Sequence, residues 1–273
     1  MLVELLNKKT IKMNKNSIRN ILGKVHISKK LPDEFSKRKI MVTPDARIKF
    51  AWPGNKVLHN EYEELLDIAL RYVKEGDTVW DIGGNVGVFS IASADRAGDT
   101  GKVICVEPDI DLVQLLRKSV QCSGNSDLNV EIVPAAVSDR SGVMVFIISE
   151  KGRTTNSLEK VRHTRQFRSG RERQLVPTIT LDHLLEVSTA PSLVKIDVEG
   201  AEHLVLNGGE HVLAEARPII YCEVGEENKN SVTDLFRENK YNLFSPQKNT
   251  NKNLRVEKCV FNTLAIPKEK SIK

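Results

Sequence analysis

Hydrophobic residues follow two alternating spacings from residue 61 to the end of the chain. Continuous apolar runs rich in β-branched residues are typical of buried strands, and apolar residues every three or four positions are typical of amphipathic helices. The predicted strands are 78–82, 102–108, 130–137, 143–149, 192–198 and 217–224, followed by two apolar segments at 241–244 and 258–266. The predicted helices are 61–73, 86–95, 109–124, 200–216 and 230–240.

Strands that alternate with helices predict an α/β fold with a mostly parallel sheet. We expect a doubly wound, seven-stranded, Rossmann-like sheet with helices on both faces, closed by the two C-terminal segments as an antiparallel hairpin. The predicted division is a basic N-terminal appendage over residues 1–60, partly disordered or helical, an α/β domain over 61–267, and a basic tail over 268–273.

The net charge of +5 is distributed unevenly along the chain. Residues 1–41 carry 11 Lys and Arg against 3 acids, a basic insert at 151–173 carries 8 against 2, and residues 246–273 carry 7 against 2. The rest of the chain is therefore acidic. The basic segments are either solvated tails and a mobile loop, or surfaces that attract an acidic partner such as a phosphorylated substrate, nucleic acid or a membrane.

Composition favours a soluble cytoplasmic protein. Hydrophobic residues make up 40% of the chain, and no apolar run approaches the roughly 18 residues that a membrane-spanning helix needs. The first residues show no secretory signal with a small-residue cleavage site. The four cysteines, Cys105, Cys122, Cys222 and Cys259, are scattered, which fits a reducing compartment better than disulfides or a zinc site.

The segment VWDIGGNVGVFSIA passes from a predicted strand through three glycines into a predicted helix. Gly83, Gly84 and Gly87 let backbone approach a ligand closely, and the start of a helix favours an anionic group. The dinucleotide fingerprint G-x-G-x-x-G is absent, because Asn85 stands at its third position. Asp81, at the end of the strand, would repel phosphates and suits a ligand with an ammonium group.

Glu107 ends the next predicted strand, in VICVEPD, 20 residues beyond Gly87. A carboxylate at this place can accept hydrogen bonds from both hydroxyls of a ribose. A ligand that combines an amine, a carboxylate and a ribose is S-adenosylmethionine. The competing interpretation is structural, with Asp81 as a helix cap and Glu107 as a solvated strand end.

These residues resemble those of Rossmann-like methyltransferases. VWDIGGNVG and VICVEPD resemble their first two motifs, and TITLDHLL, SLVKIDVEGAEHLVLNGG and RPIIYCEV narrow the resemblance to the FkbM-type methyltransferase family. The resemblance covers residues 61–266, with KIDVEGAE as its most specific segment. Gly84 departs from the family, which commonly has Ala there, a mild change that should leave cofactor binding intact.

The resemblance implies S-adenosylmethionine as the cofactor. The cofactor-binding residues that it implies are Asp81, Gly83, Gly84, Asn85, Gly87, Glu107, Ala136, Asp139 and Asp197. The glycine turn and Asp81 take the methionine portion, and Glu107 takes the ribose. Ala136 lines the adenine, and either Ser138 or Asp139 meets its exocyclic amine.

Methyl transfer to an alcohol requires alignment, exclusion of water and a base. The candidate catalytic groups follow the fourth and fifth strands and are Asp197, Glu199 and Glu223. Asp197 either contacts the cofactor amine or the acceptor hydroxyl, or caps a helix, and a helix start by itself explains Glu199 and Glu202. The three candidate carboxylates are also able to hold a divalent metal, although no spacing requires one.

Acceptor contacts are predicted at two further places. Glu61 and Tyr62 lie on a helix that covers the cleft, and Asn156 and Ser157 lie in GRTTNSLEK, where the family often presents a Ser-containing loop. The predicted activity is O-methylation of a hydroxyl on a small molecule or sugar. The alternatives are methylation of RNA or another polyanion through the basic segments, and an NAD-dependent oxidoreductase, which the missing fingerprint glycine disfavours.

Overall fold

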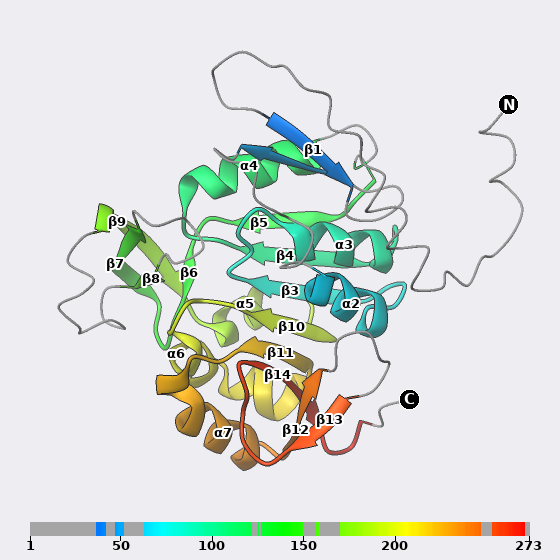
Figure 1. The fold of residues 1–273 in the computed structure, drawn as a ribbon, viewed down its shortest axis with the longest axis vertical. Helices are drawn as coiled ribbons and strands as arrows, with labels where there is room; N and C mark the ends of the chain where they lie inside the picture. Colours follow the sequence, from blue (N-terminus) through cyan, green and yellow to red (C-terminus); the bar gives the residue numbers. More distant parts are fainter. Residues whose placement is uncertain are drawn as a thin grey trace, which may run out of the picture.

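The computed structural model of the chain describes residues 37–41, 47–51, 63–121, 125, 127–149, 157–158, 170–246 and 253–270. Within these residues the chain forms one large sheet, a small second sheet and a two-stranded hairpin (Figure 1). No helix of the described part is long and apolar enough to cross a membrane.

The main sheet has eight strands in the order β13-β12-β14-β11-β10-β3-β4-β5. The parallel strands are β3 (Thr78–Ile82), β4 (Lys102–Val106), β5 (Val130–Val133), β10 (Leu193–Ile196) and β11 (Ile219–Glu223). The antiparallel strands at one edge are β12 (Tyr241–Pro246), β13 (Asn253–Val256) and β14 (Asn262–Pro267). The predicted fold class is confirmed, with β13 added to the seven strands expected, because its four residues carry too few apolar side chains to predict a strand.

The strand order reverses between β3 and β10. β4 and β5 lie on one side of β3, and β10 and β11 lie on the other. Ligands of doubly wound sheets bind beyond the carboxyl ends of the strands at such a reversal. The topology therefore places the expected site beyond the ends of β3 and β10.

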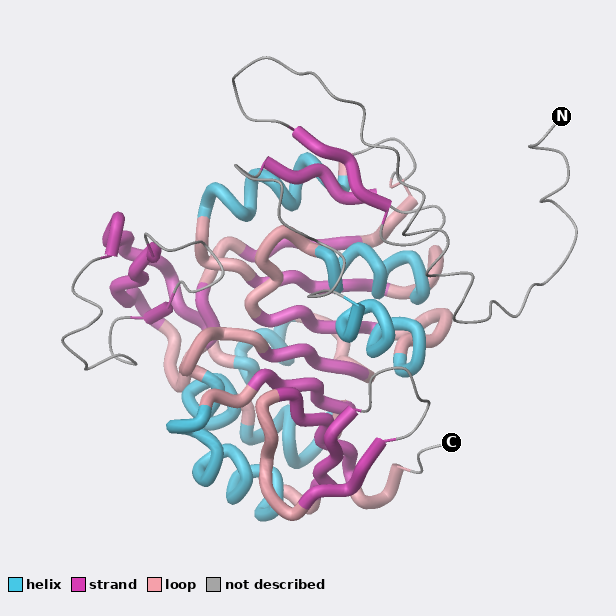
Figure 2. The backbone as a smooth tube through the Cα atoms, viewed as in Figure 1, coloured by secondary structure: helices cyan, strands magenta, loops and turns pink. Residues whose placement is uncertain are grey.

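Helices cover both faces of the main sheet (Figure 2). They are α2 (Glu63–Tyr72), α3 (Val88–Ala97), α4 (Ile110–Val120), α5 (Leu181–Val187), α6 (Glu202–Asn207), a π-helical turn (Val212–Ala216) and α7 (Lys229–Glu238). Because successive side chains of a strand face opposite sides, Trp80 packs in a core with α5, α6 and α7, whereas Val79 packs in a second core with α2 and α3. The predicted helix 200–216 is divided at Gly208, where an added Cβ would lie 2.3 Å from the carbonyl oxygen of Ser138.

A second sheet, which the sequence did not predict, has the order β6-β9-β7-β8. Its strands are β6 (Ala136–Val137), β7 (Gly142–Ser149), β8 (Ser157–Leu158) and β9 (Gly170–Ile179). The predicted strand at 130–137 is therefore two strands in two sheets, with Pro134 between them. The basic insert at 151–173 lies mostly outside the described residues, and its last part begins β9.

The described part of the N-terminal appendage is a hairpin of β1 (Lys37–Met41) and β2 (Arg47–Ala51). This hairpin contacts α4 beside the β5 edge of the main sheet (Figure 1). A hairpin differs from the disordered or helical segment expected here. The remainder of residues 1–60 lies outside the described residues, so the predicted domain boundary stays a prediction.

Candidate active site

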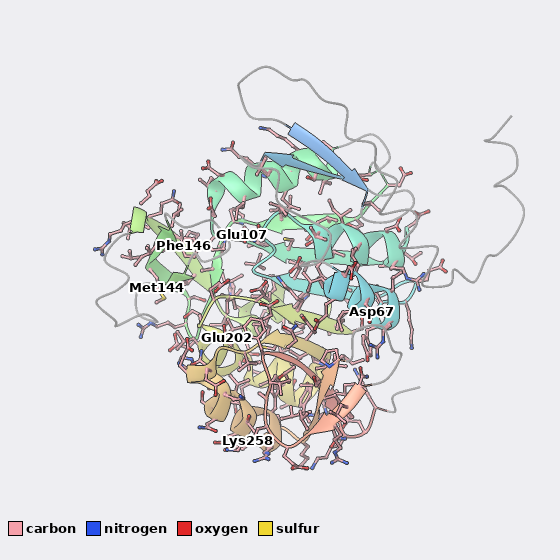
Figure 3. All side chains as sticks on the ribbon, viewed as in Figure 1. Asp67, Glu107, Met144, Phe146, Glu202 and Lys258 are labelled. Atoms are coloured by element: carbon pink, nitrogen blue, oxygen red, sulfur yellow. The ribbon has the colours of Figure 1, made fainter. Side chains whose placement is uncertain are left out.

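A cavity of about 340 Å³ opens at the carboxyl ends of the parallel strands, at the reversal of strand order. Its walls include residues from the ends of β3, β4, β10 and β11, from the start of β14, and from α2, α4 and the second sheet. The polar residues of the wall are Asn85, Glu107, Asp197, Glu199, Glu223 and Asn262. In Figure 3, Glu107, Phe146 and Glu202 lie on the side of the sheet where the parallel strands end.

Gly83 begins the glycine loop and is held between the two neighbouring strands. Its amide donates to the carbonyl of Val106 over 2.9 Å, and an added Cβ would lie 1.9 Å from the carbonyl oxygen of Asp197. Its φ of 78° is in the left-handed region that favours glycine. A side chain at this position would therefore clash with backbone and close the floor of the cavity.

Gly84 and Gly87 lie against neighbouring side chains rather than in the cavity wall. An added Cβ would lie 2.0 Å from Sγ of Cys105 at Gly84, and 2.0 Å from Cδ1 of Leu116 at Gly87. The amide of Gly84 donates to Val106 and that of Gly87 donates to the carbonyl of Gly84. These two glycines therefore let the loop pack closely against Cys105 and Leu116, outside the cavity wall. The loop amides of residues 83, 84 and 87 donate hydrogen bonds inside the protein.

Glu107 lies in the cavity wall, as expected, and two backbone amides hold its carboxylate. Asn85 donates to Oε2 and Asp109 donates to Oε1, both over 2.8 Å. Burial raises the pKa of Glu107 to about 7, although these two hydrogen bonds oppose the rise. The side chain is 5% exposed, and its orientation is therefore fixed by the glycine loop on one side and the start of α4 on the other.

Asp81 is fully buried behind the loop and does not belong to the cavity wall. Ser90 donates to its Oδ2 over 2.6 Å, and Nζ of Lys195 lies 3.2 Å from its Oδ1. The direct contact with a ligand ammonium that the sequence suggested is replaced here by an internal ammonium. The pairing register of the two strands explains this ion pair, because Lys195 of β10 lies beside Asp81 of β3 on the same face of the sheet.

Lys195 is the central cation of the site, and the sequence analysis missed it. Its Nζ donates to the carbonyl of Gly83 over 2.6 Å and lies 3.3 Å from Oδ2 of Asp197. Burial lowers the pKa of Lys195, but Asp81, Asp197 and Glu223 together raise it above the ordinary value. A Lys inside the apolar strand Leu193–Ile196 was the available signal, since a buried Lys requires acidic partners.

Asp197 and Glu223 both lie in the cavity wall, at the ends of adjacent parallel strands. Burial raises the pKa of Glu223 to about 8, and Asp197 raises it further than Lys195 lowers it. The carboxylate of Glu64 on α2 adds to this negative surrounding and accepts a hydrogen bond from Tyr221 over 3.1 Å. The structure thus brings together the two carboxylates that the sequence predicted at these strand ends.

Glu199 also lies in the cavity wall, in a loop that holds it in a left-handed conformation with φ of 52°. Glu202, in contrast, fixes that loop from inside. Its Oε1 accepts from the amide of Gly200 over 2.6 Å, and its Oε2 accepts from the side chain of Asn228 over 2.7 Å. Glu202 thus has a structural role as the first residue of α6, and Glu199 lies in the loop that precedes this helix.

The wall that adjoins the second sheet is apolar. Ala136 and Val137 of β6 line the cavity, as expected for Ala136, and Phe146 of β7 joins them. Asp139 is exposed, lies outside the cavity wall, and accepts a hydrogen bond from Ser138. The structure therefore does not bring Asp139 to the site.

The structure does not test the predicted acceptor residues. Glu61, Tyr62 and Asn156 lie outside the described residues, and Ser157 is described only as backbone in β8. Among the described residues, Phe261 and Asn262 line the wall beside Glu223. No sequence pattern predicted these two residues, because their position depends on how β14 pairs with β11.

A search of the described residues finds no group of three or more His, Cys, Asp or Glu side chains placed to hold a metal ion. The sequence left open whether Asp197, Glu199 and Glu223 hold a divalent metal, and did not require one. The ammonium of Lys195, which lies beside Asp81 and Asp197, already provides a positive charge at this position.

The fold and the cavity define an α/β protein with a ligand-sized cavity at the switch point of a doubly wound sheet. The family model described as "Methyltransferase FkbM domain" matches residues 81–266, and the chain belongs to this methyltransferase family. The resemblance found in the sequence is thereby confirmed.

The chain is also similar to individual proteins of known name or structure. The chain is 28% identical over 181 residues to the hexuronic acid methyltransferase AglP of Haloferax volcanii, covering 65% of this chain and 69% of that protein. The crystal structure of a methyltransferase FkbM from Methylobacillus flagellatus is 14% identical, with a TM-score of 0.45, covering 69% of this chain and 43% of that one. The chain thus spans less than half of the second protein. The structure of M. jannaschii TYW2 in complex with AdoMet is 13% identical, with a TM-score of 0.48, covering 87% of this chain and 88% of that one.

Proposed function

We propose that this protein is an S-adenosylmethionine-dependent methyltransferase that O-methylates a hydroxyl of a sugar or related small molecule. The observation that carries the proposal is the arrangement of the cavity wall. At the β4 side, two backbone amides hold the carboxylate of Glu107. At the β10 and β11 side, the carboxylates of Asp197 and Glu223 lie close together. The cavity volume of about 340 Å³ lies within the range of roughly 300–1,000 Å³ typical of ligand pockets.

The β4 side is suited to the nucleoside of the cofactor. Each carboxylate oxygen of Glu107 accepts one backbone hydrogen bond and retains a second acceptor position. The two hydroxyls of a ribose are donors that match these positions. Ala136 and Val137 supply apolar surface for an adenine ring. Asp81 acts indirectly in this proposal, because it holds Lys195, which in turn binds the carbonyl of Gly83 in the cavity floor.

S-adenosylmethionine supplies an electrophilic methyl group on a positively charged sulfur. The chain's own contribution is to align the acceptor and to take its proton. We assign the role of general base to Glu223, because a group with a pKa of about 8 accepts a proton efficiently near neutral pH. Asp197, held by Lys195 at 3.3 Å, orients the acceptor hydroxyl toward that base.

The carbohydrate acceptor is supported by the AglP relative, which is named as a hexuronic acid methyltransferase. Polar side chains at the cavity end beside Glu223 also suit an acceptor with several hydroxyls.

The test combines calorimetry with methyl transfer from S-adenosylmethionine labelled in its methyl group. We expect the purified chain to bind S-adenosylmethionine and not NAD, and to transfer label to a hydroxyl in a panel of glycosides. Transfer is located by mass spectrometry of the product. Binding of NAD without binding of S-adenosylmethionine would reject the proposal, and transfer to nitrogen would reject the O-methylation part of it.

A further inference from the structure

Glu64 is a buried carboxylate that the proposed mechanism does not use. It lies in the first turn of α2, next to Leu65, which lines the cavity. Glu64 is only 8% exposed, although Glu residues are almost never buried unless they are paired. The hydroxyl of Tyr221 on β11 donates to its Oε1 over 3.1 Å, and Tyr221 is itself 1% exposed. The helix therefore presents this carboxylate to the sheet rather than to water.

Tyr221 and Glu223 lie on the same face of the main sheet. They are two residues apart in β11, and successive side chains of a strand face opposite sides. The helix α2 covers this face, because Leu65 and Ile68 pack in the same core as Tyr221. Glu64 therefore approaches the strand that carries the proposed base from the helix that covers it.

The last turn of α2 is held as firmly as the first. The guanidinium of Arg71 donates to Oδ1 of Asn253 on β13 over 2.7 Å and to Oδ2 of Asp67 over 3.2 Å. The carboxamide of Asn253 in turn donates to the hydroxyl of Tyr72 over 2.6 Å. Contacts at both ends thus fix α2 over the sheet, and Glu64 keeps its place relative to β11.

The charged groups that act on Glu223 come from β10, from the loop after it and from α2. They are Lys195, Asp197, Glu199 and Glu64. Burial raises the pKa of Glu223 to about 8, and the three carboxylates add to the rise while the ammonium opposes it. Glu64 differs from Asp197 and Glu199 because it lies outside the cavity wall. Burial and Glu64 also raise the pKa of Tyr221, which therefore remains a hydrogen-bond donor.

We propose that Glu64 is a positioning residue for the general base: held by Tyr221 behind the cavity wall, its carboxylate makes Glu223 a stronger proton acceptor. A like charge favours the protonated form of a neighbouring carboxyl, so Glu223 takes the proton of the acceptor hydroxyl more readily. The inference rests on the proposed function, in which Glu223 is the base. It deepens that function by assigning a residue outside the wall that sets the strength of the base.

The test measures the titration of Glu223 directly. Side-chain carboxyl signals of protein labelled with isotopic glutamate are followed by NMR over a pH series, and Glu223→Gln identifies the signal of Glu223. We expect Glu64→Gln to lower the titration midpoint of Glu223 by about 0.5–1 pH unit, because one like charge is removed. Glu63→Gln is the matched control, since Glu63 lies in the same helical turn and is exposed, and it should leave the midpoint unchanged.

Two further variants separate charge from packing. Glu64→Asp keeps the charge and should retain most of the wild-type midpoint of Glu223. Tyr221→Phe removes the hydroxyl that holds Glu64, and should lower the midpoint by a smaller amount than Glu64→Gln does. Urea denaturation checks that each variant is folded over the pH series.

The methyl-transfer assay gives a second readout. The kcat/KM of Glu64→Gln should rise with pH through a correspondingly lower value than that of the wild type. At pH 7 this variant should therefore lie about two- to fourfold below its own plateau, whereas the wild type lies about tenfold below its plateau. A role of Glu64 in packing alone would not move this profile.

The inference is overturned if Glu64→Gln leaves the midpoint of Glu223 unchanged or, should that variant not fold, if Tyr221→Phe leaves it unchanged. It is also overturned if Glu64→Asp or the control Glu63→Gln lowers the midpoint as far as Glu64→Gln does. Failure of the proposed function is a different result. Absence of S-adenosylmethionine binding or of methyl transfer contradicts the function alone, because the NMR titration needs neither cofactor nor acceptor.

Discussion

The two ends of the cavity hold their carboxylates in different ways. At the β4 end, burial raises the pKa of Glu107 to about 7 while backbone amides of Asp109 and Asn85 oppose the rise. At the β11 end, burial raises the pKa of Glu223 to about 8, and the neighbouring carboxylate of Asp197 adds to the rise. Both groups are desolvated, yet one is surrounded by fixed donors and the other by negative charge.

Because of this difference, the two carboxylates are suited to different tasks, Glu107 to binding a ligand and Glu223 to accepting a proton. A carboxylate fixed by two amides has a defined orientation and serves as a stationary acceptor for hydroxyl groups. A carboxylate crowded by like charge gains from taking up a proton, which is the property of a general base. The comparison therefore supports the proposal that the Glu107 end recognises the cofactor and the Glu223 end takes the proton.

Glu223→Gln should give the largest loss of activity, because the amide is nearly the same size and cannot take a proton. We expect kcat to fall by about 10²- to 10⁴-fold, the usual contribution of general acid–base catalysis. The Kd of S-adenosylmethionine, measured by calorimetry, should stay within about twofold. A variant that retains most of its kcat would remove the contrast between the two ends.

Lys195→Met should give the largest loss of stability, because it leaves the fully buried Asp81 without its ammonium. Removal of one partner of a buried ion pair costs about 3–5 kcal/mol in the free energy of unfolding, measured by urea denaturation. The double variant Asp81→Asn with Lys195→Met should recover part of this loss. Equal stabilities of the single and double variants would show that the pair is not coupled.

Glu107→Gln tests the other end of the comparison. The amide group would turn at least one donor toward the backbone N–H groups of Asn85 or Asp109 and remove a charged acceptor from the ribose position. We expect the Kd of S-adenosylmethionine to rise by about 10- to 100-fold, from roughly 1.5–3 kcal/mol for hydrogen bonds to a charged group. At saturating cofactor, kcat should change by less than about threefold, the reverse of the Glu223→Gln result.

Gly84→Ala should destabilise the loop that supports the Glu107 end, because the new methyl would lie 2.0 Å from Sγ of Cys105. We expect a loss of about 1–3 kcal/mol in the free energy of unfolding, as for other overpacked cores. Cys105→Ala in the same chain should restore most of it. In this chain Cys105 occupies the space that a methyl group at residue 84 would need. The prediction that glycine here leaves cofactor binding intact stays a prediction.

The pH profile gives the smallest effect and compares the two ends in one measurement. For the free enzyme, kcat/KM should rise with pH through about 8, because only deprotonated Glu223 accepts the proton, and it should be about tenfold below its plateau at pH 7. Because the ordinary pKa of a Glu is 4.5 and that of Glu223 is raised to about 8, its contribution to stability is full below about pH 4.5 and is lost as the pH rises to about 8. Above that pH, Glu223→Gln should therefore unfold at a higher urea concentration than the wild type, although it is inactive.

The sequence predicted more of the residues at the β4 end of the cavity than at the β11 end. The glycine loop and Glu107 lie within 25 residues of one another, and their geometry depends on local backbone conformation that only certain residues allow. Lys195 and Asn262 were missed because their meaning comes from strand neighbours far away in the chain. The sequence predicted Asp81 as a site residue. The pairing of β3 with β10, however, places its carboxylate beside Lys195 and not in the cavity wall.

The contact of Gly83 with the carbonyl of Asp197 limits how this architecture can diversify. Where the two backbones meet, there is no space for even a methyl group, so residue 83 has to be glycine. The turn that carries Phe261 has no such restriction, because its ring projects into solvent at the opening. Substitutions in that turn should therefore be tolerated more easily than any side chain at residue 83.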